Sequence, residues 1–274
     1  MFEIQKPKNR KVLRQFAGKM YYRSRRQIDW RFGDKKWAKE RGALLQEHSV
    51  FRHKSMILRP LKDVDMYLQE NKRVNLKLAV THLNNIIIQP GETFSIWKLV
   101  GRPSRSKGYL DGLVLKQGEI SKGTGGGLCQ LGNLLFWIFA HSPLVIKERY
   151  RHGFDVFPDV NRKVPFGAGA TLAYNHIDLQ VKNETSQPYQ LKIWLDETHL
   201  HGELLCSEPM DATFEVVERN HIIKQQIWGG YSRHNQIVQM RNYSNGVREE
   251  VLLVENHAVM MYNPFLSENK SERA

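Results

Sequence analysis

The spacing of apolar residues predicts a helix and several short strands in the middle of the chain. Segment 75–85, NLKLAVTHLNN, carries its apolar residues at helical spacing. Segment 86–88 is a continuous apolar run that indicates a short buried strand, and the turn QPGETFS follows it. Farther along, LVLK at 113–116 predicts a strand that turns back through Gln117 and Gly118 into a second short strand.

Segment 128–141 has the length and composition of a helix, and Pro143 lies just past its end, where continuation of a helix is disfavoured. The uncharged stretch from Gly123 to Ile146 is long enough to be weighed as a membrane span, which needs about 20 apolar residues. Polar residues interrupt it, and 134–140 alone is continuously apolar. We therefore expect a helix buried in the protein core.

Alternating apolar and polar positions predict strands through the rest of the chain. Four of them fall at 144–150, 177–183, 189–195 and 199–206, and the same pattern continues from 211 to 262. The expected fold class is α+β, with a central helix that begins at a glycine-rich turn and packs on an antiparallel sheet.

Three regions are expected along the chain. They are a basic N-terminal segment, helical or partly ordered (1–62), an α+β core (63–207) and a β-rich C-terminal extension (208–274).

Positive charge is concentrated in the first of these regions. Residues 1–62 hold 18 Lys and Arg against 5 Asp and Glu, whereas residues 63–274 hold 23 of each kind. Aromatic residues are interleaved with the cations, which suits an anionic membrane surface, although a solvated basic helix face explains the pattern equally well. No nucleic-acid-binding motif accompanies the charge, so sequence-specific nucleic-acid binding is not expected.

The first 40 residues contain no apolar run of the kind that a signal peptide needs. We expect a cytoplasmic protein without a transmembrane helix. Peripheral attachment to the inner face of the membrane is compatible with this expectation.

The strongest candidate for chemistry is Cys129, at the end of GTGGGLCQ. The glycines allow a tight turn that leads directly into a helix, so a side chain at this position is held on rigid backbone. A helix N-terminus offers free amides and partial positive charge, which lower the pKa of a thiol. The alternative is a small buried apolar residue, because free cysteine is among the residues most often buried.

A nucleophilic thiol needs a base and a residue that orients the base. His152 follows a predicted strand and is the chosen base, with an exposed loop histidine as the alternative. Asp178 alternates with Ile177 and Leu179 on a strand and is the chosen orienting residue, unless it is a solvent-facing carboxylate. Asp155 and Asp159 are weaker candidates for that role.

Other chemistry finds little support in the pattern. His199 and His201 share one face of a strand, but no further ligand has recognisable spacing, so no metal site and no cofactor are expected. Cys206 is expected in the core of a strand, and the two cysteines do not form a disulfide scaffold.

The motifs PGETFS and GTGGGLCQLGNLLFW, in this order within residues 75–190, resemble the VanW family, as do GYLDGLVLKQGEI and HIDLQVKNETSQPY. The resemblance implies a role in cell-wall metabolism and glycopeptide resistance. It also implies peptidoglycan L,D-transpeptidation with Cys129 as the nucleophile. Family members commonly carry an Asp before the Ala-Thr pair that follows the turn, whereas this chain has Gly169 there.

Two functional hypotheses follow from the resemblance, and the sequence leaves open whether the chain is an enzyme. In the first, Cys129 attacks a carbonyl of a stem peptide or precursor and His152 moves the proton. The amides near Gly126, Gly127 and Leu128 would hold the oxyanion, with Gln130 as a side-chain donor and Glu92 as a brace. In the second, the chain is a noncatalytic accessory protein that binds cell-wall precursors or partner enzymes at the inner membrane surface.

Overall fold

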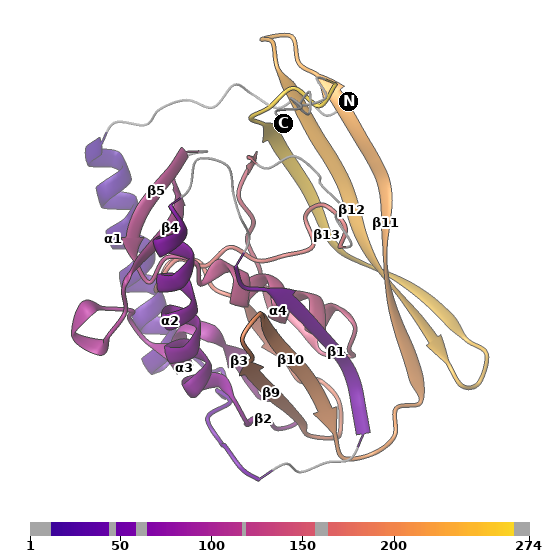
Figure 1. The fold of residues 1–274 in the computed structure, drawn as a ribbon. Helices are drawn as coiled ribbons and strands as arrows, with labels where there is room; N and C mark the ends of the chain where they lie inside the picture. The colour runs from indigo at the N-terminus through magenta and orange to yellow at the C-terminus, as the bar shows by residue number, and fades with distance from the viewer. Residues whose placement is uncertain (1–11, 44–47, 59–64, 117–118, 157–163, 266–274) are drawn as a thin grey trace.

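The computed structural model describes residues 12–43, 48–58, 65–116, 119–156 and 164–265, and Figure 1 shows their arrangement. A long helix, α1, lies at one edge of the molecule, and a short buried helix, α4, lies near its centre. The helices are α1 (Val12–Phe32), α2 (Met66–Leu83), α3 (Ile96–Val100) and α4 (Cys129–Ala140), with one 3-10 turn at Arg105–Lys107.

The main sheet is antiparallel and has the strand order β1-β10-β9-β2. Its strands are β1 (His48–Met56), β10 (His199–Cys206), β9 (Tyr189–Leu195) and β2 (Ile86–Ile88). Helix α4 packs on β1 and β10, while α2 packs on β9. The central helix of the fold therefore lies on an antiparallel sheet, as the apolar pattern predicts.

From Leu134 onward, helix α4 is apolar on all sides because this part of it is buried. Its residues from Leu134 to Ala140 are all buried. Gly202 of β10 lies directly beneath it, and a Cβ on this glycine would come within 2.6 Å of the Ile138 side chain. The absence of a side chain at Gly202 thus allows the helix to approach the sheet closely.

Two smaller sheets lie beside the core. One has the order β3-β8-β6, and the other is the hairpin β4-β5. Their strands are β3 (Thr93–Ser95), β8 (Gln180–Lys182), β6 (Val145–Glu148), β4 (Asp111–Lys116) and β5 (Glu119–Thr124).

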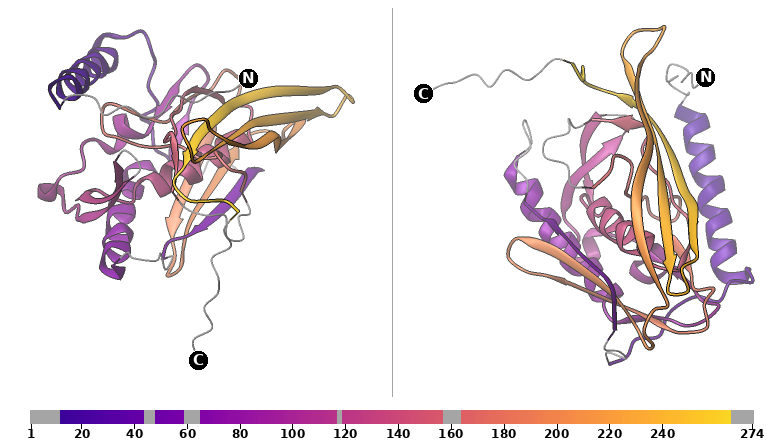
Figure 2. Two further views of the ribbon diagram at one scale, coloured as in Figure 1. Left: turned by 90° about the horizontal axis from the view of Figure 1, so that it is seen from above. Right: turned by 90° about the vertical axis from the view of Figure 1, so that its right-hand side faces the viewer.

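The C-terminal sheet has the order β11-β12-β13-β7, and its three long strands cover the far end of α4 (Figures 1 and 2). These strands are β11 (Ala212–Gln225), β12 (Tyr231–Tyr243) and β13 (Arg248–Met260), and β7 (Phe154–Asp155) pairs with β13 in parallel. Gln239 of β12 donates hydrogen bonds from Nε2 to the carbonyls of Ala140 (2.7 Å) and Ser142 (2.9 Å). A side chain of the C-terminal sheet therefore satisfies carbonyl groups that the end of a helix leaves open.

The expected α+β class with a β-rich C-terminus is confirmed. Strand β1 was not anticipated, because segment 48–56 is rich in basic and polar residues and lies in the region expected to be helical. It alternates in exposure and pairs with β10, so tertiary pairing outweighs its weak strand composition. The division into three regions stays a prediction. One apolar cluster contains Trp30, Ile57 and Ile237 together with the core.

Within the ranges that the structure describes, none of the helices combines the length and the apolar character needed to cross a membrane.

The contact between Gln239 and the end of α4 generates a stability prediction. Gln239→Ala removes the donors for two buried carbonyls, and we expect the free energy of unfolding to fall by about 1–3 kcal/mol in urea titrations. Gln236→Ala on the same strand is the matched control, because within the described residues Gln236 makes exposed side-chain bonds to Asn220 and Glu255 and none to α4. Equal losses in the two variants would show that the C-terminal sheet does not support α4 through Gln239.

Candidate functional site

The backbone of the glycine-rich turn packs closely against the backbone of a neighbouring segment. Gly125 and Gly127 have positive φ values of 75° and 89°, which glycine adopts without steric cost. A Cβ on Gly126 would overlap the backbone of Gly112, and a Cβ on Gly127 would overlap the side chain of Lys72. Each of the three glycines is therefore required by its own surroundings.

Asn75 of α2 connects this turn to the rest of the core. The side chain is fully buried and donates from Nδ2 to the carbonyls of Leu110 (2.9 Å) and Gly126 (3.0 Å). Its Oδ1 accepts from the amide of Leu110 at 2.8 Å. Sequence reasoning missed Asn75, and the available signal was a polar residue among the apolar positions of the predicted helix.

Cys129 is the first residue of α4 and carries a free, partly buried thiol. Its Sγ accepts from the amide of Leu172 at 3.5 Å and lies 3.8 Å from the carbonyl oxygen of the same residue. Gly132, one turn into the helix, makes room for this segment, because a Cβ there would lie 2.7 Å from the carbonyl oxygen of Ala170. The thiol is thus held between the helix start and the backbone of Leu172.

The electrostatics at Cys129 differ from the expectation of a lowered pKa. Burial raises the pKa of the Cys129 thiol, and the amides of Leu172 and of Cys129 itself oppose this only in part. The pKa-lowering effect of the helix N-terminus therefore does not outweigh the pKa-raising effect of desolvation. The resting form of this cysteine at neutral pH is the protonated thiol.

Two of the amides expected to hold an oxyanion are already engaged. Gly126 donates to the carbonyl of Gly123 and Gly127 to that of Leu113, both at 2.9 Å. In the described part of the chain, no carbonyl accepts a hydrogen bond from the Leu128 amide. At this helix start, the Leu128 amide therefore remains for an incoming oxygen, whereas the amide of Cys129 interacts with its own thiol.

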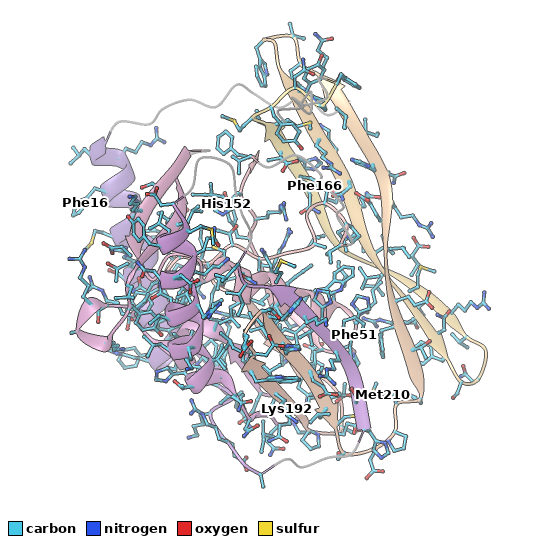
Figure 3. All side chains as sticks on the ribbon, in the orientation of Figure 1. Phe16, Phe51, His152, Phe166, Lys192 and Met210 are labelled. Atoms are coloured by element: carbon cyan, nitrogen blue, oxygen red, sulfur yellow. The ribbon has the colours of Figure 1, made fainter. Side chains whose placement is uncertain are left out.

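His152 belongs to the segment beside the one that holds the thiol. Its amide donates to Oγ1 of Thr171 at 3.1 Å, and the amide of Thr171 donates to the carbonyl of Tyr150 at 2.7 Å. Leu172, which contacts Cys129, is the next residue. These contacts place the His152 backbone beside residues 171–172, but in the described residues no hydrogen bond joins His152 to Cys129. Figure 3 shows His152 between the β4-β5 hairpin and Phe166.

Burial lowers the pKa of His152, and the nearby Arg151 lowers it further. The imidazole is therefore neutral at neutral pH, which is the form that accepts a proton.

Asp178 is buried against a different element, at the start of α3. Its Oδ2 accepts from the hydroxyl of Ser95 at 2.5 Å, and its Oδ1 accepts from the amides of Trp97 (3.2 Å) and Leu179 (2.9 Å). Among the described residues, none of its hydrogen bonds is with His152. An orienting role at the thiol stays a prediction, whereas the observed contacts brace the first turn of α3.

The raised pKa of Asp178, about 6, has burial as its main cause. The neighbouring Glu148 also raises it, while the hydroxyl of Ser95, the amide of Trp97 and the guanidinium of Arg26 lower it. Glu148 is itself bound by Arg26 through two hydrogen bonds of 2.6 and 2.5 Å. The group is a structural network between α1, β6 and α3.

Gln130 and Glu92 are engaged in contacts of their own. Gln130 donates from Nε2 to Oγ of Ser55 (2.9 Å) and to the carbonyl of Met56 (2.8 Å), so it ties β1 to the start of α4. Glu92 accepts from the amide of Gln89 at 3.0 Å and closes its own turn. Neither side chain has a recorded hydrogen bond to Cys129 in the described residues.

Gly169 leaves a space that another side chain fills. A Cβ at this position would overlap Oδ1 of Asn133, which accepts from the amide of Ala170 at 3.0 Å. Asn133 on α4 thus occupies the room in which the carboxylate expected from the family pattern would begin.

The remaining candidates lie elsewhere. Asp155 pairs with Arg233 at 3.5 Å in the C-terminal sheet, and Asp159 lies outside the described residues. The ring of His201 stacks on Trp194 and its Nε2 lies 2.5 Å from a carboxylate oxygen of Asp196. Among the described residues, no cluster of three or more His, Cys, Asp or Glu side chains is suited to hold a metal ion.

The fold and this corner define a class of α+β protein in which a glycine-rich turn places a cysteine at the start of a buried helix. Residues 71–205, just under half of the chain, match the family model described as VanW like protein, and this segment belongs to the VanW family.

Two curated relatives match the chain. It is 41% identical over 152 residues to the vancomycin B-type resistance protein VanW of Enterococcus faecalis, which covers 56% of this chain and 55% of that protein. It is 33% identical over 121 residues to the uncharacterized protein YoaR of Bacillus subtilis, covering 43% of this chain and 37% of YoaR. The chain thus spans about half or less of the length of these relatives. No solved structure matches it.

The pKa of Asp178 predicts a specific dependence of stability on pH. Because its folded pKa of about 6 exceeds its ordinary value of 3.8, the protonated form favours the fold. This contribution is complete below pH 3.8 and is lost as the pH rises through about 6. In Asp178→Asn, thermal melts across this range should lack that loss, whereas the exposed Asp211→Asn should melt like the wild type at each pH. Identical curves for Asp178→Asn and the wild type would contradict the assignment.

The space at Gly169 generates a second prediction. Gly169→Asp should lower the free energy of unfolding by about 1–3 kcal/mol, because the new Cβ overlaps Asn133. Combining it with Asn133→Ala should recover part of the loss, and urea titrations of the four proteins of the double-mutant cycle measure this coupling. Strictly additive losses would show that Asn133 does not occupy that space.

Proposed function

We propose that this chain is a cell-wall accessory protein related to glycopeptide resistance, and that Cys129 takes up an acyl group from a peptidoglycan stem peptide or precursor. Sequence similarity to a vancomycin B-type resistance protein supports the role in glycopeptide resistance. The position of the Cys129 thiol at the start of α4 supports the proposed acyl transfer. No cofactor enters the proposed reaction.

One observation carries the chemical part of this proposal. The Sγ of Cys129 lies at the start of α4, where the amide of Leu128 donates to no carbonyl in the described residues. Amides in this arrangement stabilise the negative charge that develops on a carbonyl oxygen under attack. The same corner therefore combines a nucleophile with an oxyanion site.

The proposed reaction starts from a neutral thiol and a neutral imidazole. Sγ attacks the carbonyl carbon of a peptide bond as His152 accepts the thiol proton, and the carbonyl electron pair moves onto oxygen. Collapse of this intermediate breaks the bond from carbon to nitrogen and gives a thioester, while His152 returns the proton to the leaving amine. An amine of a second stem peptide, or water, then attacks the thioester and releases the thiol.

A second candidate function is favoured by the raised pKa of Cys129. In this alternative the chain is a noncatalytic accessory protein, and the glycine-rich corner is a binding surface for a cell-wall precursor or a partner enzyme. The buried thiol then fills space between α4 and Leu172 and forms no bond to the ligand.

The two candidates differ in whether a covalent adduct forms at Cys129. When the protein is mixed with a synthetic stem pentapeptide and quenched in acid, intact-mass spectrometry should detect an acyl adduct. The adduct should be absent in Cys129→Ser and should form at least tenfold more slowly in His152→Gln, because the base is lost. Cys206→Ser is the matched control, since Cys206 is fully buried in β10, and should react like the wild type.

Iodoacetamide labelling adds a readout that needs no substrate. Cys129 should label faster than Cys206 because it is the more exposed, with a rate that still increases above the ordinary pKa of a thiol. If no adduct forms while Cys129→Ser binds the pentapeptide as tightly as the wild type in calorimetry, the acyl-transfer proposal is wrong and the binding candidate holds.

A further inference from the structure

Helix α1 presents an apolar stripe to solvent along its full length. An α-helix turns about 100° per residue, so residues four apart form one slowly winding row. Phe16, Met20, Ile28 and Phe32 lie in such a row and are 63%, 48%, 60% and 80% exposed. Leu13, 79% exposed, extends it by a turn. Ser24 interrupts this row, and the exposed apolar residues on either side of it mark a site of interaction.

Basic side chains border this stripe on both sides. By helical geometry, Arg14 and Arg25 flank one side of the stripe and Arg23 the other, and all three are exposed. Lys19 is exposed as well, but it lies on the side of Arg26 and acts on His176. The single acidic residue of the helix, Asp29, binds Lys35 at 3.0 Å. The solvent-facing half of α1 therefore combines apolar residues with uncompensated positive charge.

The opposite face of α1 holds the helix on the protein. Trp30 is buried, and its carbonyl accepts a hydrogen bond from Lys98 at 2.6 Å. Arg26 pairs with Glu148, and the ring of Tyr22 lies 5.2 Å from that of His176. These contacts do not involve the stripe. Figure 2 shows α1 along the edge of the molecule, so the stripe is accessible to a flat partner.

We infer that α1 docks this protein on an anionic lipid surface, with the helix lying parallel to the membrane plane. The apolar stripe would enter the boundary between headgroups and acyl chains, and the flanking cations would meet the lipid phosphates. A second copy of the chain fits this surface less well, because its cations would face cations. A nucleic acid would pair with the cations but would leave the aliphatic residues without an apolar partner. This inference does not depend on any reaction at Cys129.

The test is cosedimentation of the full chain with vesicles of equal parts phosphatidylglycerol and phosphatidylcholine. The wild type should bind these vesicles and fail to bind pure phosphatidylcholine. Replacing Phe16, Ile28 and Phe32 by serine should weaken binding at least tenfold. The triple variant Arg14→Gln, Arg23→Gln and Arg25→Gln should weaken it about a hundredfold at low salt.

Ile227→Ser is the matched control, because Ile227 is 91% exposed at a distant turn of the C-terminal sheet, and its binding should equal that of the wild type. All substituted side chains are exposed, so the melting temperatures should stay close to the wild-type value. Equal binding to neutral and anionic vesicles would overturn the inference. So would unimpaired binding of either triple variant, or a dimer in ultracentrifugation that the serine variant dissociates.

Discussion

The candidate site depends on the contact between the backbones of Gly112 and Gly126. The two backbones are so close that neither glycine could carry a side chain. Asn75 of α2 is hydrogen-bonded to the carbonyl of Gly126 and so links the turn to that helix. Helix α4 can then begin immediately after the turn and continue into the apolar core. The packing of the surrounding backbone, and not the cysteine itself, therefore determines the position of Cys129.

Much of the fold follows from periodicity along the chain. The helix at 128–141 and the short strand at 86–88 were predicted because their apolar runs are bounded by glycine, proline and turn residues. Strand β1 was not, because its exposed face is basic and its partner β10 lies about 150 residues away in sequence, beyond the reach of local pattern. The three long C-terminal strands lie within segment 211–262, where the alternating pattern predicts strands without giving their bounds.

The candidate site was predicted less completely, for a physical reason. A pattern can identify which residue starts a helix, so Cys129 was found. It cannot give the balance between desolvation and a helix terminus, and here desolvation prevails at the thiol. Nor can it reveal which neighbour binds a buried carboxylate, as Asp178 and its bonds to the start of α3 illustrate. Glu92, Gln130 and Asn133 likewise have partners that only the tertiary structure reveals.

The pairing of β1 with β10 has a consequence for the family segment itself. Residues 71–205 include β10, but the strand that covers its outer edge comes from 48–56, outside that segment. An uncovered edge presents a row of open amides and carbonyls that templates the addition of strands from other molecules. Strand β1 pairs with this edge and becomes the outer strand of the sheet, and its basic side chains disfavour the addition of a strand from another molecule.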